Sequence, residues 1–155
     1  MGRVKDNKYV EMMMRDITTF GGGFFTFFLA VLLFIVGKGT VAERLVLGFP
    51  LIYPITALIR LVYYKKRPKP ETHTNFIEWI DSSSFPSIHA ANSFYMAFVL
   101  HSAFASNPAS LFLFFLAAFV GYTRIYFKKH YPVDVAGGAV LGLALSYLTV
   151  NYVVL

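Results

Sequence analysis

Five stretches of about twenty mostly apolar residues follow one another along this chain of 155 residues. A helix needs about 20 apolar residues to cross a bilayer, and helices and closed barrels are the structures that satisfy their backbone groups there. The sequence therefore predicts an all-α, integral membrane helical bundle. The five expected spans are residues 20–36, 40–64, 87–105, 108–127 and 133–155.

The composition supports a membrane protein rather than a water-soluble domain. Hydrophobic residues make up 57% of the chain and charged residues 14%, whereas soluble domains average roughly 45–50% and about 25%. The length is compatible with a single domain over residues 1–155. Because the chain has no cysteine, disulfides and thiol chemistry are excluded.

The formal net charge of +6 indicates contact with anionic headgroups or an anionic substrate. No motif of nucleic-acid recognition accompanies the charge, so we expect no nucleic-acid partner, and we infer no protein partner. Residues 1–19 predict an amphipathic helix at the membrane surface. A plain interfacial anchor is the favoured interpretation of that helix, and capture of substrate is the alternative.

The polar residues between the spans gather on one side of the predicted bundle. The connection over residues 65–86 is long, and such a segment in a compact protein is usually functional or disordered. With five spans, the ends of the second and fourth helices and the starts of the third and fifth lie on the same side of the membrane. We expect the chemistry of the chain to be on that side.

Three clusters on that side carry residues suited to phosphate chemistry. Arg60 and Arg67 are separated by seven positions, and Arg124 comes near the end of a predicted helix. The sequence "PSIH", ending at His89, opens another helix, whose first amides and positive dipole end suit a phosphate oxygen. His130 lies four residues before Asp134, and a carboxylate can hold one imidazole N–H while the other nitrogen attacks.

The order and spacing of these clusters resemble the type 2 phosphatidic acid phosphatase superfamily. Its pattern is Lys-x6-Arg-Pro, then Pro-Ser-Gly-His, then Ser-Arg-x5-His-x3-Asp, and the matching stretches here are "RLVYYKKRP", "PSIH" and "TRIYFKKHYPVD". Three residues depart from that pattern. Arg60 replaces lysine, Ile88 replaces glycine and Thr123 replaces serine, so the charge and the hydroxyl are kept and the glycine's freedom is lost.

The resemblance implies a role for each matching residue. His130 would be the nucleophile that forms a phosphohistidine, Asp134 would orient it, and His89 would protonate the leaving oxygen. Phosphate would be held by Arg60, Arg67, Ser87, Ile88 and Arg124. The resemblance implies neither a metal nor a cofactor, since three arginines can stabilise the transferring group.

Several interpretations remain open at the level of sequence. The same fold could pass the phosphoryl group to a second lipid instead of water, and a small transporter or scaffold is the non-enzymatic alternative. The substrate is a membrane lipid phosphate, with lipid A 1-phosphate preferred over undecaprenyl pyrophosphate and phosphatidylglycerol phosphate. His73 and His101 are expected to be bystanders. Headgroup anchoring is expected of Lys65, Lys66, Lys69, Lys128 and Lys129.

The orientation in the membrane receives two conflicting indications. The predicted active side carries most of the lysines and arginines, which the positive-inside rule would place in the cytoplasm. The family resemblance implies the outer face of the inner (plasma) membrane. Because charges recruited for phosphate binding confound the rule, the outer, periplasmic face is preferred.

Overall fold

The chain forms a bundle of helices, and the computed structural model describes residues 8–69, 72–104 and 107–153. No strand occurs within these residues, so the all-helical prediction is confirmed. The helices in order are α1 (Lys8–Thr19), α2 (Gly23–Ile35), α3 (Gly39–Val62), α4 (Phe76–Ser82), α5 (Ile88–Phe104), α6 (Asn107–Tyr126) and α7 (Pro132–Tyr152).

The number of helices long enough to span a membrane is smaller than the five predicted. Within the described residues, α3, α6 and α7 are long and apolar enough to cross a bilayer. The pair α1 and α2, bent by 56° at the break between them, gives a fourth if it counts as one span. The predicted first span shortens to the 13 residues of α2, and α5 has 17 residues within the described part of the predicted third span. Glycines explain the first difference, because Gly22 is extended and Gly37 has φ +76, which ends the helix.

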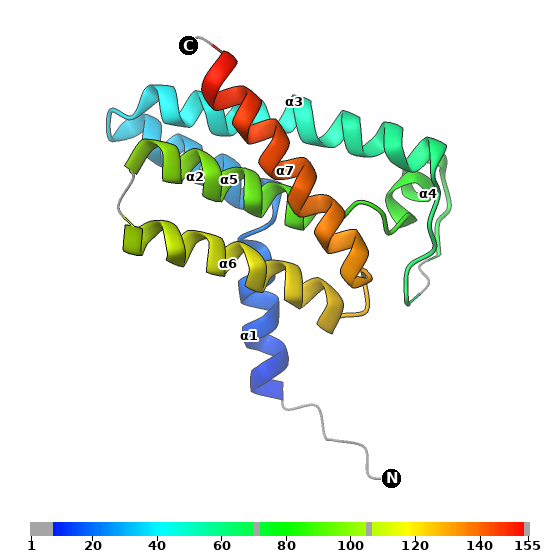
Figure 1. Cartoon of the computed structure of the whole chain (residues 1–155). Coiled ribbons are helices and arrows are strands. Elements are labelled where there is room, and N and C mark those ends of the chain that lie inside the picture. The colour runs from blue at the N-terminus through cyan, green and yellow to red at the C-terminus, as the bar shows by residue number, and fades with distance from the viewer. Residues whose placement is uncertain (1–7, 70–71, 105–106, 154–155) are drawn as a thin grey trace.

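The helix α5 occupies the centre of the bundle. It packs most extensively against α7 and α6 and also contacts α3, while α2 runs along α3 (Figure 1). Large apolar side chains such as Phe24, Phe34 and Leu111 are exposed on the outside. In a soluble protein so much exposed apolar surface would be unusual, but lipid covers it in a membrane.

Small residues on α7, among them Gly138 and Gly142, allow α5 to approach it closely. A Cβ atom added at Gly138 would collide with the backbone carbonyl of Ser87, and one at Gly142 with that of Ala91. The two helices therefore meet backbone to backbone. This contact fixes the start of α5 beside the start of α7.

The polar segments gather at one end of the bundle, as expected from the predicted topology. The ends of α3 and α6, the starts of α5 and α7, and the short helix α4 all lie there (Figure 1). The Ser87 amide donates a hydrogen bond to the Asp134 carbonyl at 3.0 Å, which joins the starts of α5 and α7 directly. The first described helix, α1, contacts α6 and projects away from the bundle (Figure 1).

Candidate active site

Two of the predicted phosphate-binding arginines are held by the same residue of α4. The Asp81 carbonyl accepts hydrogen bonds from Arg60 Nη1 at 3.3 Å and from Arg67 Nη2 at 2.6 Å. The Asp81 carboxylate also pairs with Arg60 Nη1 at 2.8 Å, and Arg60 Nη2 donates to the Pro86 carbonyl at 3.1 Å. Asp81 thus brings the end of α3 and the connection after it to the start of α5.

The third arginine is positioned by α1. Arg124, near the end of α6, donates from Nη1 to the Thr18 hydroxyl at 3.1 Å. The hydroxyls of Thr18 and Thr123 lie 2.9 Å apart. The N-terminal helix therefore touches the predicted third motif directly, which an anchor that only holds the chain to the membrane surface would not require.

Arg60 and Arg124 retain hydrogen-bonding capacity. The Nε atoms of Arg60 and Arg124 are buried and have no hydrogen-bond partner among the described residues. Arg60 is only 2% exposed. A buried guanidinium with an unused donor is costly unless an anion completes its bonding, so this cluster is suited to an oxyanion.

His130 is buried and is fixed by a backbone carbonyl. Its Nδ1 lies 2.6 Å from the Ser84 carbonyl oxygen. A carbonyl only accepts, so Nδ1 carries the proton and the lone pair is on Nε2. Burial, together with the positive charges of Arg124, Arg67 and Arg60, lowers the pKa of His130 to about 3, against the opposing hydrogen bond to Ser84. At neutral pH the imidazole is therefore uncharged and nucleophilic at Nε2.

Asp134 has partners other than the expected imidazole. Its carboxylate is fully buried, and it accepts hydrogen bonds from Lys65 Nζ at 2.6 Å and from the Tyr131 amide at 2.7 Å. Lys65 also lies over the Tyr131 ring, 4.7 Å from its centroid. No hydrogen bond joins Asp134 to His130 in the described part of the chain. Asp134 instead fixes the first turn of α7 and the residue next to His130.

This geometry corrects the expectation for Lys65, which the sequence places among the headgroup anchors. Its side chain is 23% exposed and forms an ion pair with a carboxylate that has no contact with solvent. Of the other four lysines, three are exposed and Lys129 is partly buried. The sequence alone could not distinguish Lys65 from the other four lysines, because its partner Asp134 lies 69 residues further along the chain.

The start of α5 lies as the "PSIH" motif predicts. Ser87 precedes the helix, and its hydroxyl accepts weakly from the Ala90 amide at 3.5 Å. The Ser87 amide is used by Asp134, whereas the amides of Ile88 and His89 belong to the first turn, where intrahelical partners are missing. His89 interacts electrostatically with the charges of Arg124, Asp81, Arg67 and Arg60. His89 and His130 thus share one arginine cluster.

The sequence interpretation missed the parts of the connection between α3 and α5 that build the site. These are α4 with Asp81 and the buried run Ser82, Ser83 and Ser84. The Ser84 amide donates to the Lys65 carbonyl at 2.7 Å, and the Lys65 amide donates to the Ser83 hydroxyl at 3.1 Å. An available signal for α4 was Asn75, which caps the helix by accepting from the Glu78 amide at 2.9 Å.

The remaining histidines lie outside this cluster. His101, near the far end of α5, pairs with the Ser110 hydroxyl at 2.6 Å, and His73 is exposed in the connection before α4. Within the described residues, no three His, Asp, Glu or Cys side chains gather in a way that could hold a metal ion.

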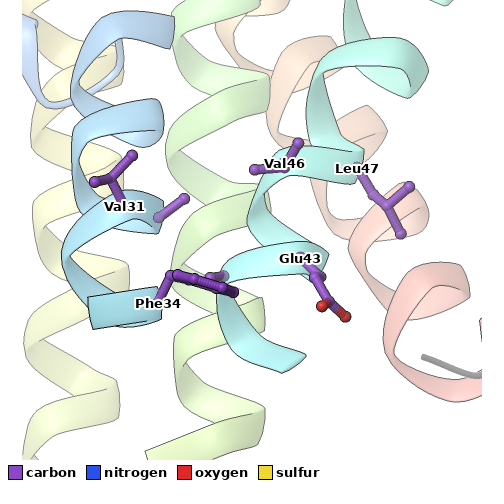
Figure 2. A pocket seen from close by; sticks show the side chains of 7 residues that line it. Val31, Phe34, Glu43, Val46 and Leu47 are labelled. Carbon is purple, nitrogen blue, oxygen red and sulfur yellow. The ribbon is translucent and has the colours of Figure 1, made fainter. Parts of the chain in front are cut away.

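A groove between α2 and α3 is also remote from the site (Figure 2). Its lining is apolar apart from Glu43, as with Val31, Phe34 and Val46. Glu43 lies 17 positions before Arg60 on α3, which is about 25 Å along a helix. The groove therefore faces the opposite end of the bundle and takes no part in the arginine cluster.

Parts of the chain are similar in sequence to two bacterial phosphatases. A Bacteroides thetaiotaomicron lipid A 4'-phosphatase is 45% identical over 58 residues, which is 37% of this chain and 26% of that protein. The Bacillus subtilis undecaprenyl-diphosphatase BcrC is 32% identical over 95 residues, which is 61% of this chain and 48% of the relative. The chain thus spans less than half the length of either curated relative in these matches.

Two crystal structures resemble nearly the whole of this chain in fold. Aquifex aeolicus LpxE matches with a TM-score of 0.78 and 25% identity, over 96% of this chain and 89% of that one. A Bacillus subtilis PAP2-type phosphatidylglycerolphosphate phosphatase, described as transmembrane, matches with a TM-score of 0.65 and 25% identity, over 96% and 78%. The PAP2 superfamily model matches residues 47–155, which include the arginines and histidines described above. The chain is a membrane-integral member of the PAP2 superfamily.

Proposed function

We propose that the chain is a membrane lipid-phosphate phosphatase that works through a phosphohistidine at His130. One observation supports the proposal most directly. The buried, neutral imidazole of His130 donates its Nδ1 proton to the Ser84 carbonyl, and three arginines lie close enough to act on it electrostatically. Such an imidazole has a free Nε2 lone pair, and the arginines stabilise the negative charge of a phosphoryl group in flight. We also propose that residues 1–155 form a single domain.

In the first step, Nε2 of His130 attacks phosphorus, and the bond from phosphorus to the lipid oxygen breaks. Arg60, Arg67 and Arg124 bind the non-bridging oxygens, assisted by the Ser87 hydroxyl and the amides of Ile88 and His89. His89 donates its proton to the departing oxygen, so that the lipid leaves as an alcohol or as a shorter phosphate.

In the second step, water attacks the phosphohistidine. His89, now lacking its proton, accepts one from the water as the bond from phosphorus to Nε2 breaks. Phosphate leaves, and both histidines return to their starting protonation states. Asp134 acts as a positioning residue, since its carboxylate fixes Tyr131 beside the nucleophile. Three arginines serve the role of a metal ion, so the reaction is proposed to be metal-independent.

The preferred substrate is lipid A carrying a 1-phosphate. The support for lipid A is the local similarity to a lipid A 4'-phosphatase. Undecaprenyl pyrophosphate and phosphatidylglycerol phosphate are the alternatives, supported by the other two relatives. The site is proposed to face the periplasmic side of the inner membrane, as the family resemblance implies.

The test is phosphate release from purified lipids in detergent micelles, with trapping of the phosphoenzyme. Wild-type protein should release phosphate from at least one of the three lipid classes, and rapid acid-free quenching should recover phosphohistidine. His130→Ala should abolish both signals. Phosphate transferred to a second lipid instead of water would identify a phosphotransferase, and full function of His130→Ala in cells would favour the transporter or scaffold.

A further inference from the structure

The joint between α1 and α2, residues 20–22, lies against the two helices that carry His89 and Arg124. Asn92, about one turn after His89 on α5, is buried and donates from Nδ2 to the Gly21 carbonyl at 3.3 Å. A Cβ atom added at Gly21 would collide with the backbone carbonyl of His89 and with the side chain of Val120 on α6. The joint is therefore fixed between α5 and α6, and it determines where the last turn of α1 lies.

That last turn places the hydroxyl of Thr18 at the end of a chain of hydrogen bonds. Thr18 Oγ1 lies 3.1 Å from Arg124 Nη1 and 2.9 Å from the Thr123 hydroxyl. The Thr123 hydroxyl also lies 2.6 Å from the Val120 carbonyl, and a hydroxyl has one proton to donate. Because a carbonyl only accepts, Thr123 donates its proton to Val120. Thr18 therefore donates to Thr123 and accepts from Arg124.

The arginine held in this way is the one that matters most to the two histidines. Of the three predicted phosphate-binding arginines, Arg124 has the strongest electrostatic effect on both His89 and His130. An arginine side chain has several rotatable bonds, so an acceptor that holds one N–H group decides where the other donors of the planar fork point. In the described part of the chain, Thr18 supplies that acceptor to Arg124.

We propose that Thr18 is a positioning residue of the active site, which holds Arg124 in the orientation that receives the phosphoryl group. Thr18 acts through the guanidinium and has no contact with the substrate. It lies outside residues 47–155, which the PAP2 model matches, so the last turn of α1 adds to the site a part that the family motifs do not contain. This inference rests on the proposed function, since it assigns a further residue to the same reaction.

The test compares two substitutions at position 18 by turnover of p-nitrophenyl phosphate and by calorimetric binding of orthovanadate. Thr18→Val keeps the shape of the side chain and removes the acceptor. It should lower kcat/KM and weaken vanadate binding by about 10- to 100-fold each, the effect of one hydrogen bond to a charged group. Thr18→Ser keeps the hydroxyl and should retain most of both.

A double-mutant cycle separates positioning from a merely structural role. If Thr18 acts through Arg124, adding Thr18→Val to Arg124→Gln should weaken vanadate binding no further. A structural role would instead weaken binding to the same degree in both backgrounds. Vanadate binding is the readout for this cycle because it does not require turnover by the Arg124→Gln variant.

Thr19→Val is the matched control. Thr19 is exposed in the same turn, and its hydroxyl donates to the Asp16 carbonyl at 2.6 Å, so its loss should leave turnover and vanadate binding unchanged. The inference is refuted if Thr18→Val behaves like this control, if Thr18→Ser is equally impaired, or if the effect of Thr18→Val persists beside Arg124→Gln. A wild type that shows the expected dependence of vanadate binding on Thr18 but releases no phosphate from any substrate would refute the proposed function alone. A wild type that binds no vanadate would refute the inference.

Discussion

Replacing Lys65 with methionine should destabilise the protein more than any other single change to its surface lysines. The substitution keeps the apolar stem over Tyr131 and removes the charge that faces Asp134. At 2.6 Å and an effective dielectric constant of about 20, the gross attraction is roughly 6 kcal/mol. Desolvation offsets much of this. Loss of a hydrogen bond between charged groups costs about 1.5–3 kcal/mol, and breaking a fully buried pair about 3–5 kcal/mol.

Because the Lys65 side chain is 23% exposed, we expect Lys65→Met to lower the free energy of unfolding by about 2–3 kcal/mol. Asp134→Asn should cost less, since the amide oxygen still accepts from Tyr131 and the freed Lys65 ammonium can turn toward water. The double variant should be more stable than the sum of the two single losses implies, with a coupling energy of about 1.5–3 kcal/mol.

The measurement is denaturant-induced unfolding in detergent micelles, followed by the fluorescence of Trp79. This is the single tryptophan of the chain, and it stacks on Tyr64 with ring centroids 5.0 Å apart, next to Lys65. Lys66→Met is the matched control, because Lys66 is exposed and contacts Ser84 through its backbone carbonyl. A Lys65 variant as stable as this control, or the absence of coupling in the double variant, would refute the reasoning.

Four other outcomes are expected. Phosphate release should continue undiminished in EDTA, and a strict need for added Mg²⁺ or Zn²⁺ would contradict the role given to the arginines. His89→Ala should keep much more activity on p-nitrophenyl phosphate than on a lipid phosphate, because a phenolate leaves without the proton that is worth about 10²–10⁴-fold for an alcohol. Nitrogen NMR of labelled histidine should find His130 neutral and protonated at Nδ1 at pH 5.5, since its pKa of about 3 lies below that pH; an imidazolium signal there would exclude the assigned tautomer. A cysteine introduced at Lys128 should react with an impermeant maleimide outside intact cells while one at Lys38 does not, and the reverse pattern would place the site in the cytoplasm.

Apolar runs and motif spacing predicted the helices and the end of the bundle at which the site lies. Runs of apolar residues identify helices because the bilayer demands them, and alternation of the helices then places Arg60, His89 and His130 on one side. The predicted lengths failed at the glycines. Gly22 is extended inside the predicted span over residues 20–36, so α2 begins only at Gly23 although the sequence is already apolar from Phe20.

Hydrogen-bond partners that are far apart in the sequence could not be predicted in the same way. A carboxylate four residues after a histidine suggests a hydrogen bond between them, yet the fold presents His130 with the Ser84 carbonyl, 46 residues away. The competing partner is a backbone atom, which any residue supplies. Asp81 was similarly hidden, because its carbonyl, rather than its side chain alone, collects Arg60 and Arg67.

The contact of α5 and α7 through Gly138 and Gly142 determines which movements the bundle can make without loss of geometry. His89 is carried by α5, and Asp134, beside the nucleophile, is carried by α7. At Gly138 and Gly142 no side chain separates the two helices, so a rotamer change there cannot alter the spacing of their backbones. A bilayer of different thickness can tilt α2, α3 or α6, which meet lipid through long, adaptable side chains. The two helices that hold the reacting groups should tilt together, as one body.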